Sequence, residues 1–96
     1  MNPMVVNCTE IAVRELFPEA LKSYQQRVNN ICTCQRCLDD IVALALNYLP
    51  PHYVGSERGS IITSVDYQRL GGRTEVFARI CQAIKVVYEN PRHHIE

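Results

Sequence analysis

The sequence predicts a mainly α-helical domain, a small bundle of about three to four helices with an irregular connector and room for one short strand. Two observations predict this class. Apolar residues recur at three- and four-residue intervals through three stretches, and proline or glycine pairs interrupt or separate them. Because no repeat, low-complexity tract or linker divides residues 1–96, we expect one domain.

The first helix is predicted to open at Asn7, a helix-capping residue, with Glu10 three positions on. We expect the Asn7 side chain to accept from the Glu10 amide and the Glu10 carboxylate to reach back. Apolar positions at helical spacing then continue from Val13 to Ile31. Pro18 interrupts this run and is expected to kink the helix.

The second helix is predicted from Gln35 to Asn47, with Asp39 and Asp40 in its first turn, where the helix dipole favours carboxylates. Its apolar stripe consists of Leu38, Ile41, Val42, Ala45, Leu46 and Leu49. Pro50-Pro51 should end this helix.

A connector over residues 52–62 should follow, with a short strand allowed at 60–63. The third helix is predicted to begin at Thr63 and to end at Asn90-Pro91. Gly71-Gly72 should kink this helix or divide it in two. Its predicted buried face is Val76, Phe77, Ile80, Cys81, Ile84, Val87 and Tyr88.

Composition excludes several classes of protein. Ten basic and ten acidic residues cancel, so we expect no binding to nucleic acid. No apolar run approaches the roughly 18–20 residues that span a bilayer, and no signal peptide is visible, so we expect a cytoplasmic protein without a membrane partner. Five cysteines in a reducing compartment argue against a disulfide framework.

Three of these cysteines, Cys32, Cys34 and Cys37, lie within six residues just before the second predicted helix. The helix amino terminus and the nearby Arg36 should both lower thiol pKa values, as metal binding requires. Thiols at this spacing predict a structural zinc site ahead of an iron–sulfur cluster. The alternative is a set of unligated or redox-sensing thiols.

Zinc in a structural site has four ligands, so one must come from elsewhere. We predict Cys81, although it also fits the apolar stripe of its helix. His93, His94 and a residue of a partner chain remain alternatives. Cys8, at the first helical position, is interpreted as a bystander.

With these residues identified, the chain resembles the ComFB family of late competence proteins over nearly its full length. The resemblance is carried, in order, by Asn7-x-x-Glu10, Cys32-Thr33-Cys34-Gln35 with Cys37, Asp40, Ala43-Leu44, Leu46-Asn47, Pro51-x-Tyr53-Val54 and Pro91-Arg92. The segment from Cys32 to Val54 is its most specific part.

The resemblance implies a homodimer that holds zinc through cysteines and has no known catalysis. It also implies a regulatory role in competence, motility or cell size, because some members look like receptors for cyclic di-GMP. In one respect this chain departs from the family: His93 and His94 stand where relatives place a late cysteine after the Pro-Arg pair.

An enzyme is not expected. The three histidines, His52, His93 and His94, lie in no nucleophile–base motif, and no phosphate-binding glycine pattern occurs. Catalytic zinc sites keep an open position and favour histidine or carboxylate ligands, which a cysteine-rich segment does not provide.

Two hypotheses of function remain. In the first, the chain senses a cyclic dinucleotide, cyclic di-GMP or cyclic di-AMP. Arginines beside glycines would grip phosphate or guanine, and an aromatic ring would stack on a base. The candidate residues are Tyr53, Arg58, Arg69, Arg73 and Arg92. In the second, the chain is a zinc-stabilised adaptor for an unknown protein partner, and these arginines are solvated turn residues.

Overall fold

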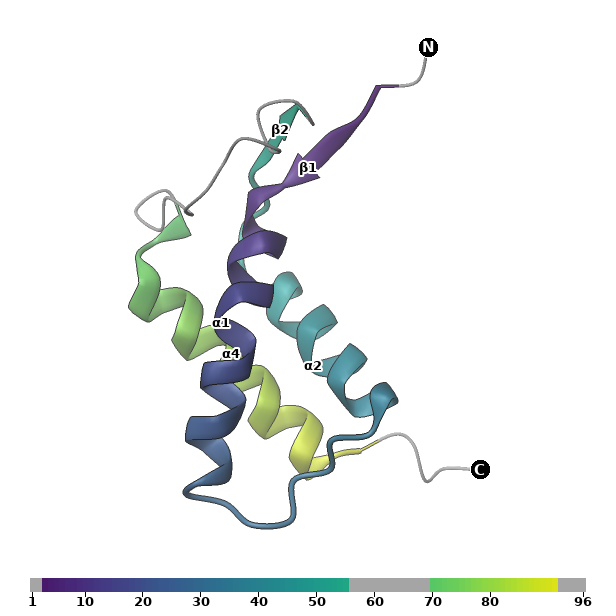
Figure 1. The fold of residues 1–96 in the computed structure, drawn as a ribbon, viewed down its shortest axis with the longest axis vertical. Coiled ribbons are helices and arrows are strands. Elements are labelled where there is room, and N and C mark those ends of the chain that lie inside the picture. Colours follow the sequence, from purple (N-terminus) through teal and green to yellow (C-terminus); the bar gives the residue numbers. More distant parts are fainter. Residues whose placement is uncertain (1–2, 56–69, 92–96) are drawn as a thin grey trace.

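Helices make up most of residues 3–55 and 70–91, the parts of the chain that the computed structural model describes. Within these ranges the elements are, in chain order, β1 (Val5–Asn7), α1 (Cys8–Gln25), α2 (Gln35–Tyr48), β2 (Tyr53–Gly55) and α4 (Arg73–Glu89). The helices pack against one another, and the two strands extend beyond one end of them (Figure 1). The predicted mainly α-helical class is confirmed.

Helix α1 begins at Asn7, as the sequence predicts, but with different bonding partners. The Asn7 Oδ1 atom accepts from the backbone amide of Thr9 at 3.1 Å and from that of His52 at 2.9 Å. The expected bond from the Glu10 amide is therefore replaced. Since Glu10 lies one turn before Arg14, its carboxylate bonds that guanidinium at 2.9 Å instead of reaching back to the cap.

The same helix runs through Pro18 and ends at Gln25, which corrects the prediction that it continues to Ile31. The amides of Arg27 and Val28 both donate to the Tyr24 carbonyl, a pattern of a closing helical turn. Asn30 then adopts a left-handed conformation with φ of 68°. Asparagine tolerates this conformation better than most residues, so the chain turns here.

Strands β1 and β2 form a two-stranded antiparallel sheet in which Val6 pairs with Val54. This sheet was not predicted; the strand allowed at residues 60–63 lies outside the described residues. Beyond the sheet, the same two segments are joined by the hydrogen bond that the His52 amide donates to the Asn7 side chain. Thr9 also donates its hydroxyl to the Pro50 carbonyl at 2.7 Å. The start of α1 is thereby tied to the segment after α2.

Helix α2 agrees with the prediction to within a residue at its end, and Cys34 is its cap. Asp39 and Asp40 lie beyond the first turn, however, because the helix begins at Gln35. The expected dipole interaction is therefore wrong for both. Asp39 instead accepts from the Gln35 side chain one turn earlier, at 2.7 Å.

Helix α4 begins at Arg73 and ends before Asn90, whose amide closes the last turn. The expected start at Thr63 lies outside the described residues. Gly71 and Gly72 both have positive φ, 93° and 100°, which side chains with a Cβ rarely adopt. The glycine pair therefore separates α4 from the preceding turn, one of the two outcomes the sequence allows.

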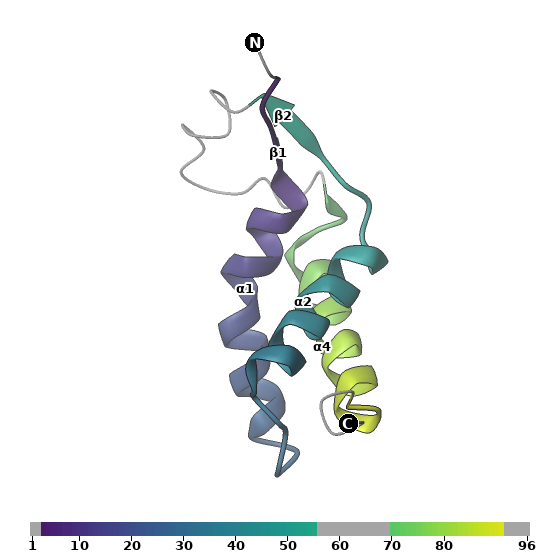
Figure 2. The ribbon, with the colours of Figure 1, turned by 90° about the vertical axis from the view of Figure 1, so that its right-hand side faces the viewer.

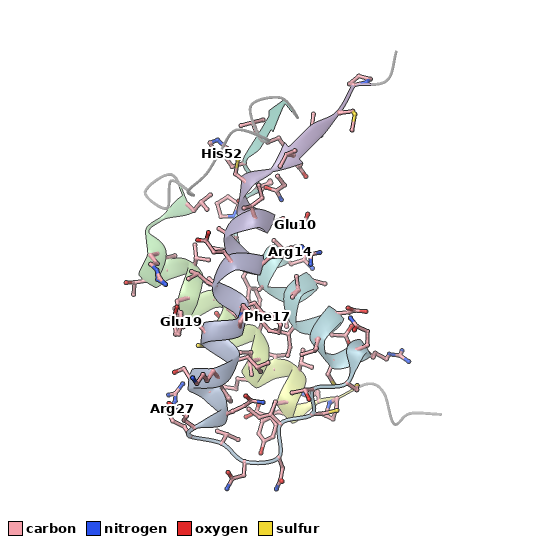
Figure 3. The ribbon with its side chains drawn as sticks, viewed as in Figure 1. Glu10, Arg14, Phe17, Glu19, Arg27 and His52 are labelled. Atoms are coloured by element: carbon pink, nitrogen blue, oxygen red, sulfur yellow. The ribbon has the colours of Figure 1, made fainter. Side chains whose placement is uncertain are left out.

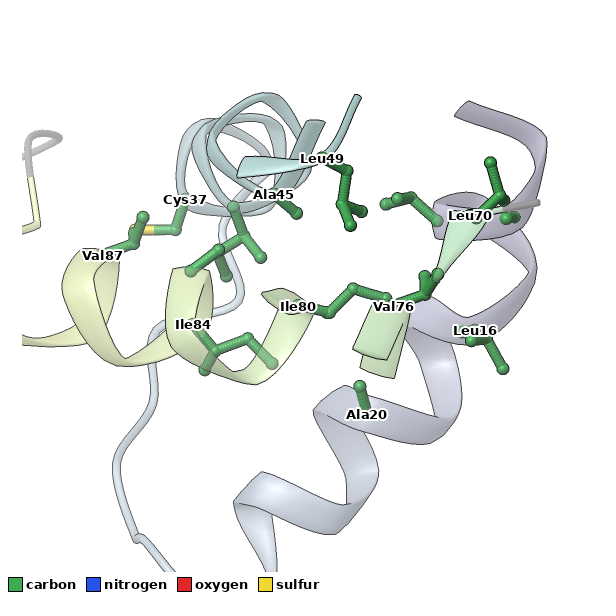
Figure 4. Close-up of a cluster of buried hydrophobic side chains, with 14 residues drawn as sticks. Leu16, Ala20, Cys37, Ala45, Leu49, Leu70, Val76, Ile80, Ile84 and Val87 are labelled. Carbon is green, nitrogen blue, oxygen red and sulfur yellow. The ribbon is translucent and has the colours of Figure 1, made fainter. Parts of the chain in front are cut away.

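The three helices enclose one apolar core (Figure 4). The buried apolar side chains are Ala12, Val13, Leu16, Ala20, Cys37, Ile41, Ala45, Leu49, Leu70, Val76, Ile80, Ala83, Ile84 and Val87. At the end of the bundle away from the strands, the α1–α2 connector lies level with the last turn of α4 (Figure 2). No helix within the described ranges combines the length and hydropathy that crossing a bilayer requires.

Candidate metal centre

Three cysteine side chains meet where the chain enters α2. Cys32 lies two residues before the cap, Cys34 is the cap itself, and Cys37 lies in the first turn. Their Sγ atoms all lie within 4.8 Å of one another. In a tetrahedral site with zinc–sulfur bonds of about 2.3 Å, sulfur atoms are separated by about 3.8 Å. The thiols therefore need only a small contraction to bind one ion together.

Local hydrogen bonding favours one thiolate in this group. The Cys34 Sγ accepts from the Cys37 backbone amide at 3.4 Å, and this bond is the main reason that the pKa of Cys34 is lowered. Burial of Cys37 raises its pKa to about 12. Arg36, expected to act through its charge, helps to lower the pKa of Cys34 through its backbone amide. A metal ion held by all three sulfurs must therefore displace a proton from Cys37.

A small cavity adjoins the thiols on the side of α4. Its volume is about 70 Å³, and Cys32 and Cys37 line it together with Val87 and Tyr88 of α4 and with Pro91, which follows the helix. Asn30, Ile31 and Ile41 complete the lining. The cysteine group thus lies where the α1–α2 connector, α2 and the end of α4 meet.

The fourth ligand is not among the side chains that the structure brings to this group. Within the described ranges the group contains only the three clustered cysteines, and Cys81 is not part of it. Burial raises the pKa of the Cys81 thiol, and the nearby charge of Arg27 opposes this. Cys81 as a ligand stays a prediction, and His93 and His94 lie outside the described residues.

The donor set fits zinc. Soft thiolate ligands suit zinc in tetrahedral sites better than magnesium or calcium, which prefer oxygen. Cys32, Cys34 and Cys37 would hold the ion, which would contribute stability by cross-linking the connector to α2. The geometry therefore agrees with the metal site that the sequence predicts.

Comparison with known proteins decides the family. A family model described as "Late competence development protein ComFB" matches residues 6–91 of this chain. The chain belongs to the ComFB family. The resemblance seen in the motifs of the sequence is thereby confirmed, and the match includes all three clustered cysteines.

Relatives in the ComFB family agree with this assignment in sequence and in fold. The chain is 32% identical over 88 residues to the competence protein ComFB of Bacillus subtilis (strain 168), covering 92% of this chain and 86% of that protein. A solved structure titled as the structural characterization of the late competence protein ComFB from Bacillus subtilis is 30% identical. It superimposes with a TM-score of 0.69 and covers 95% of this chain and 96% of the other.

The residues predicted to bind a nucleotide are only partly described. Tyr53 lies on β2 with 63% of its surface exposed. Arg73, the first residue of α4, contacts the Glu19 carboxylate of α1 at 2.9 Å, and both side chains are largely exposed. Arg58, Arg69 and Arg92 lie outside the described residues, so the predicted site as a whole stays a prediction.

A groove between α1 and α2 was not predicted from the sequence. It has a volume of about 450 Å³ and is lined by Arg14, Phe17, Gln35, Leu38, Asp39, Val42, Ala43 and Leu46. Figure 3 shows Arg14 and Phe17 on the side of α1 that faces α2, with Glu19 on the other side. The apolar stripe predicted for α2 could have indicated this groove, because the core does not bury every residue of the stripe. Its members Leu38, Val42 and Leu46 are only partly buried.

Proposed function

We propose that this ComFB-family chain is a non-catalytic regulatory protein whose fold is stabilised by a structural zinc ion. The observation that carries the proposal is the convergence of the three Sγ atoms of Cys32, Cys34 and Cys37 to within 4.8 Å at the start of α2. Two of these residues precede the helix and one lies in it, so a shared ion would anchor the connector to α2.

The chemistry of these ligands favours a structural role. Thiolates donate strongly to zinc and leave it a weak Lewis acid, whereas catalytic sites use mostly histidine and carboxylate with an open position. Cys37 is also only 2% exposed, so substrate cannot approach the ion from that side. A sulfur-rich site with one buried ligand stabilises a fold.

Metal analysis of the protein purified without added metal tests the proposal. We expect about one zinc per chain in the wild type, the same content in Cys8→Ser, and loss of most zinc in Cys34→Ser. Cys8 is a matched control because it lies on α1, outside the cysteine group. Equal zinc in both variants, or none in the wild type, would contradict the proposal.

We further propose that the regulatory signal is a cyclic dinucleotide, chiefly cyclic di-GMP, acting on competence, motility or cell size. Two observations support this. The ring of Tyr53 is exposed enough to stack on a base, and Arg73 follows two glycines at a helix amino terminus, where backbone amides and a guanidinium favour phosphate. Arg58, Arg69 and Arg92 are included on the sequence pattern alone.

Titration calorimetry with cyclic di-GMP and cyclic di-AMP tests this signal. We expect saturable binding that Arg73→Ala and Tyr53→Ala weaken at least about tenfold, the scale of one lost charged or stacking contact. Lys85→Ala is the control, because Lys85 pairs with Glu89 near the opposite end of α4. If neither nucleotide binds, the alternative takes precedence: a zinc-stabilised adaptor for an unidentified protein.

We also propose that two copies of the chain associate through the groove between α1 and α2. Its apolar lining includes Phe17, Leu38 and Val42, while Arg14 and Asp39 supply opposite charges on the same surface. In a two-fold dimer each surface meets its own copy, so a patch that carries both signs is self-complementary. A homodimer would also present two copies of any nucleotide site to a ligand with two-fold symmetry.

A further inference from the structure

Cys34 and Cys37 form a Cys-x-x-Cys pair at the start of α2, and the fold directs their side chains toward each other. Cys34 is the cap of the helix, and its Sγ atom accepts from the Cys37 amide at 3.4 Å. Side chains in an α-helix lean toward its amino terminus, so the Cys37 side chain points back toward the cap. This spacing is also that of the dithiols of thioredoxin-like proteins, which form reversible disulfides.

The positions of the sulfur atoms favour a disulfide between these two residues. All three Sγ atoms of the group lie within 4.8 Å of one another. A disulfide needs sulfur atoms about 2.05 Å apart, which rotation of the two side chains at one helix start can provide. Cys32 is less suited, because it lies in the connector and is separated from Cys34 by a single residue. A loop that short strains the geometry of a disulfide.

Burial determines which of the two sulfurs an oxidant reaches. Cys34 is partly exposed, whereas Cys37 is only 2% exposed. Cysteines that sense oxidants are characteristically accessible and lie beside a second cysteine, which reacts with the first oxidation product. Cys34 therefore fits the attacked residue, and the buried Cys37 fits the residue that completes the disulfide.

We propose that Cys34 and Cys37 are a modification site at which hydrogen peroxide forms a reversible disulfide and thereby removes two of the three thiolates that would hold zinc. The Cys34 sulfur bonds one peroxide oxygen, the oxygen–oxygen bond breaks, and the departing hydroxide takes a proton to become water. The Cys37 sulfur then displaces the oxygen from Cys34, which leaves as a second water with a proton from Cys37 or from solvent. Two electrons pass from the sulfurs to peroxide.

The disulfide cannot replace the metal as a structural link. The inference rests on the proposed zinc site, in which the ion ties Cys32 of the connector to α2. A Cys34–Cys37 disulfide closes a loop within the start of α2 alone, and a loop this short contributes little stability. The connector and the end of α4 share the small cavity beside Cys32. Oxidation should therefore loosen this end of the bundle, and the oxidised protein should melt at a lower temperature than the zinc-loaded one.

Treatment of the zinc-loaded wild type with hydrogen peroxide tests the inference through two readouts. Disulfides are mapped by peptide mass spectrometry after free thiols are blocked with N-ethylmaleimide, and released zinc is measured with a chromophoric chelator. We expect Cys34–Cys37 as the first disulfide, with about one zinc released per disulfide. Dithiothreitol followed by added zinc should reverse both changes. Cys8→Ser and Cys81→Ser are matched controls that should behave as the wild type, because both residues lie outside the cysteine group.

Two variants test the order of reaction in the metal-free protein. In Cys37→Ser no disulfide should form with Cys34, and dimedone, which traps sulfenic acids, should label Cys34. Cys32→Ser keeps both members of the pair and should form the Cys34–Cys37 disulfide as the wild type does. Circular dichroism checks that the variants fold, and the disulfide map of the wild type tests the pair without any substitution.

A first disulfide that includes Cys32, Cys8 or Cys81 would overturn the inference, as would a Cys34–Cys37 disulfide that forms while zinc stays bound. A wild type that never binds zinc would instead refute the proposed function. The disulfide map of that metal-free protein would still show whether Cys34 and Cys37 react as a pair, so the two failures are distinguishable.

Discussion

Asn7 joins two distant parts of the chain through a single side-chain oxygen, which accepts from Thr9 at the start of α1 and from His52 beyond α2. We expect Asn7→Ala to lower the free energy of unfolding by about 1–2 kcal/mol, because both amides lose their acceptor. Asn7→Asp keeps the acceptor and should lose much less. Urea unfolding followed by circular dichroism measures the difference, and an unchanged midpoint for Asn7→Ala would contradict this role.

Thiol chemistry should distinguish the cysteines once metal is removed. The pKa of Cys34 is lowered, so more of it is thiolate at neutral pH, while the pKa values of Cys37 and Cys81 are raised by burial. Because the thiolate is the nucleophile, iodoacetamide should label Cys34 first and the other two much more slowly at pH 7.5. Peptide mass spectrometry over time gives the order, and faster labelling of Cys81 than of Cys34 would contradict this assignment.

At this scale the sequence predicts a residue's role when the partner is close in the chain. Asn7 is recognisable as a cap because the orphan amides follow it directly. Its bond to His52 is not predictable, because it depends on how the chain returns after α2. The expectation for Asp39 and Asp40 was wrong although the helix begins at the predicted Gln35, because they are its fifth and sixth residues and a turn of α-helix takes only 3.6 residues.

Among the elements, α4 depends on the glycine pair before it. Gly72 has φ of 100°, and a Cβ added there would meet no atom within 4 Å, so a substitution there acts through backbone strain alone. Since its ψ is 154°, Gly72 lies in a backbone region that essentially only glycine adopts, and we expect Gly72→Ala to cost about 1–3 kcal/mol. Gly55→Ala on β2 is the control. Gly55 does not have a positive φ, and a Cβ added there would also meet no atom within 4 Å. Thermal melts that show equal losses would refute the assignment of strain to Gly72.

Element prediction succeeded where apolar periodicity and terminators agree. The stripe of α2 ends at a proline pair, and α4 ends at Asn90-Pro91, so both ends were predicted well. The end of α1 was placed too late because Val28 and Ile31 continue the helical spacing although the helix closes at Gln25. Strands β1 and β2 are three residues each and have no alternating pattern long enough to recognise.

For the whole molecule, the groove between α1 and α2 leads to a prediction about assembly. Val42 lines this groove and is only partly buried within one chain. If two copies meet there, Val42→Lys should turn a dimer into a monomer, because it places an unpaired charge in the interface. Val86→Lys is the control, since Val86 is exposed on α4 and lies outside the groove.

Light scattering coupled to size exclusion, run over a range of concentrations, measures this change in mass. The proposal requires a dimer for the wild type and Val86→Lys, and a monomer for Val42→Lys. A monomeric wild type would exclude the proposed dimer. A dimer that survives Val42→Lys would show that the interface lies outside this groove.

Only the part of the candidate site that is formed by residues close together in the sequence was predictable. Cys32, Cys34 and Cys37 are close in the chain, so a turn into a helix suffices to bring their sulfurs together. The fourth ligand depends on which distant element reaches this point. Sequence spacing alone could not choose between Cys81 on α4 and the histidines beyond Pro91, and the structure shows that Cys81 does not join the three sulfurs.

X-ray absorption at the zinc edge of the purified protein tests the central claim most directly, because it counts and identifies the atoms bonded to the metal. The claim predicts a shell that contains at least three sulfur atoms at about 2.3 Å. A spectrum with only nitrogen and oxygen neighbours, or a protein without zinc that melts at the same temperature after zinc is added, would contradict it.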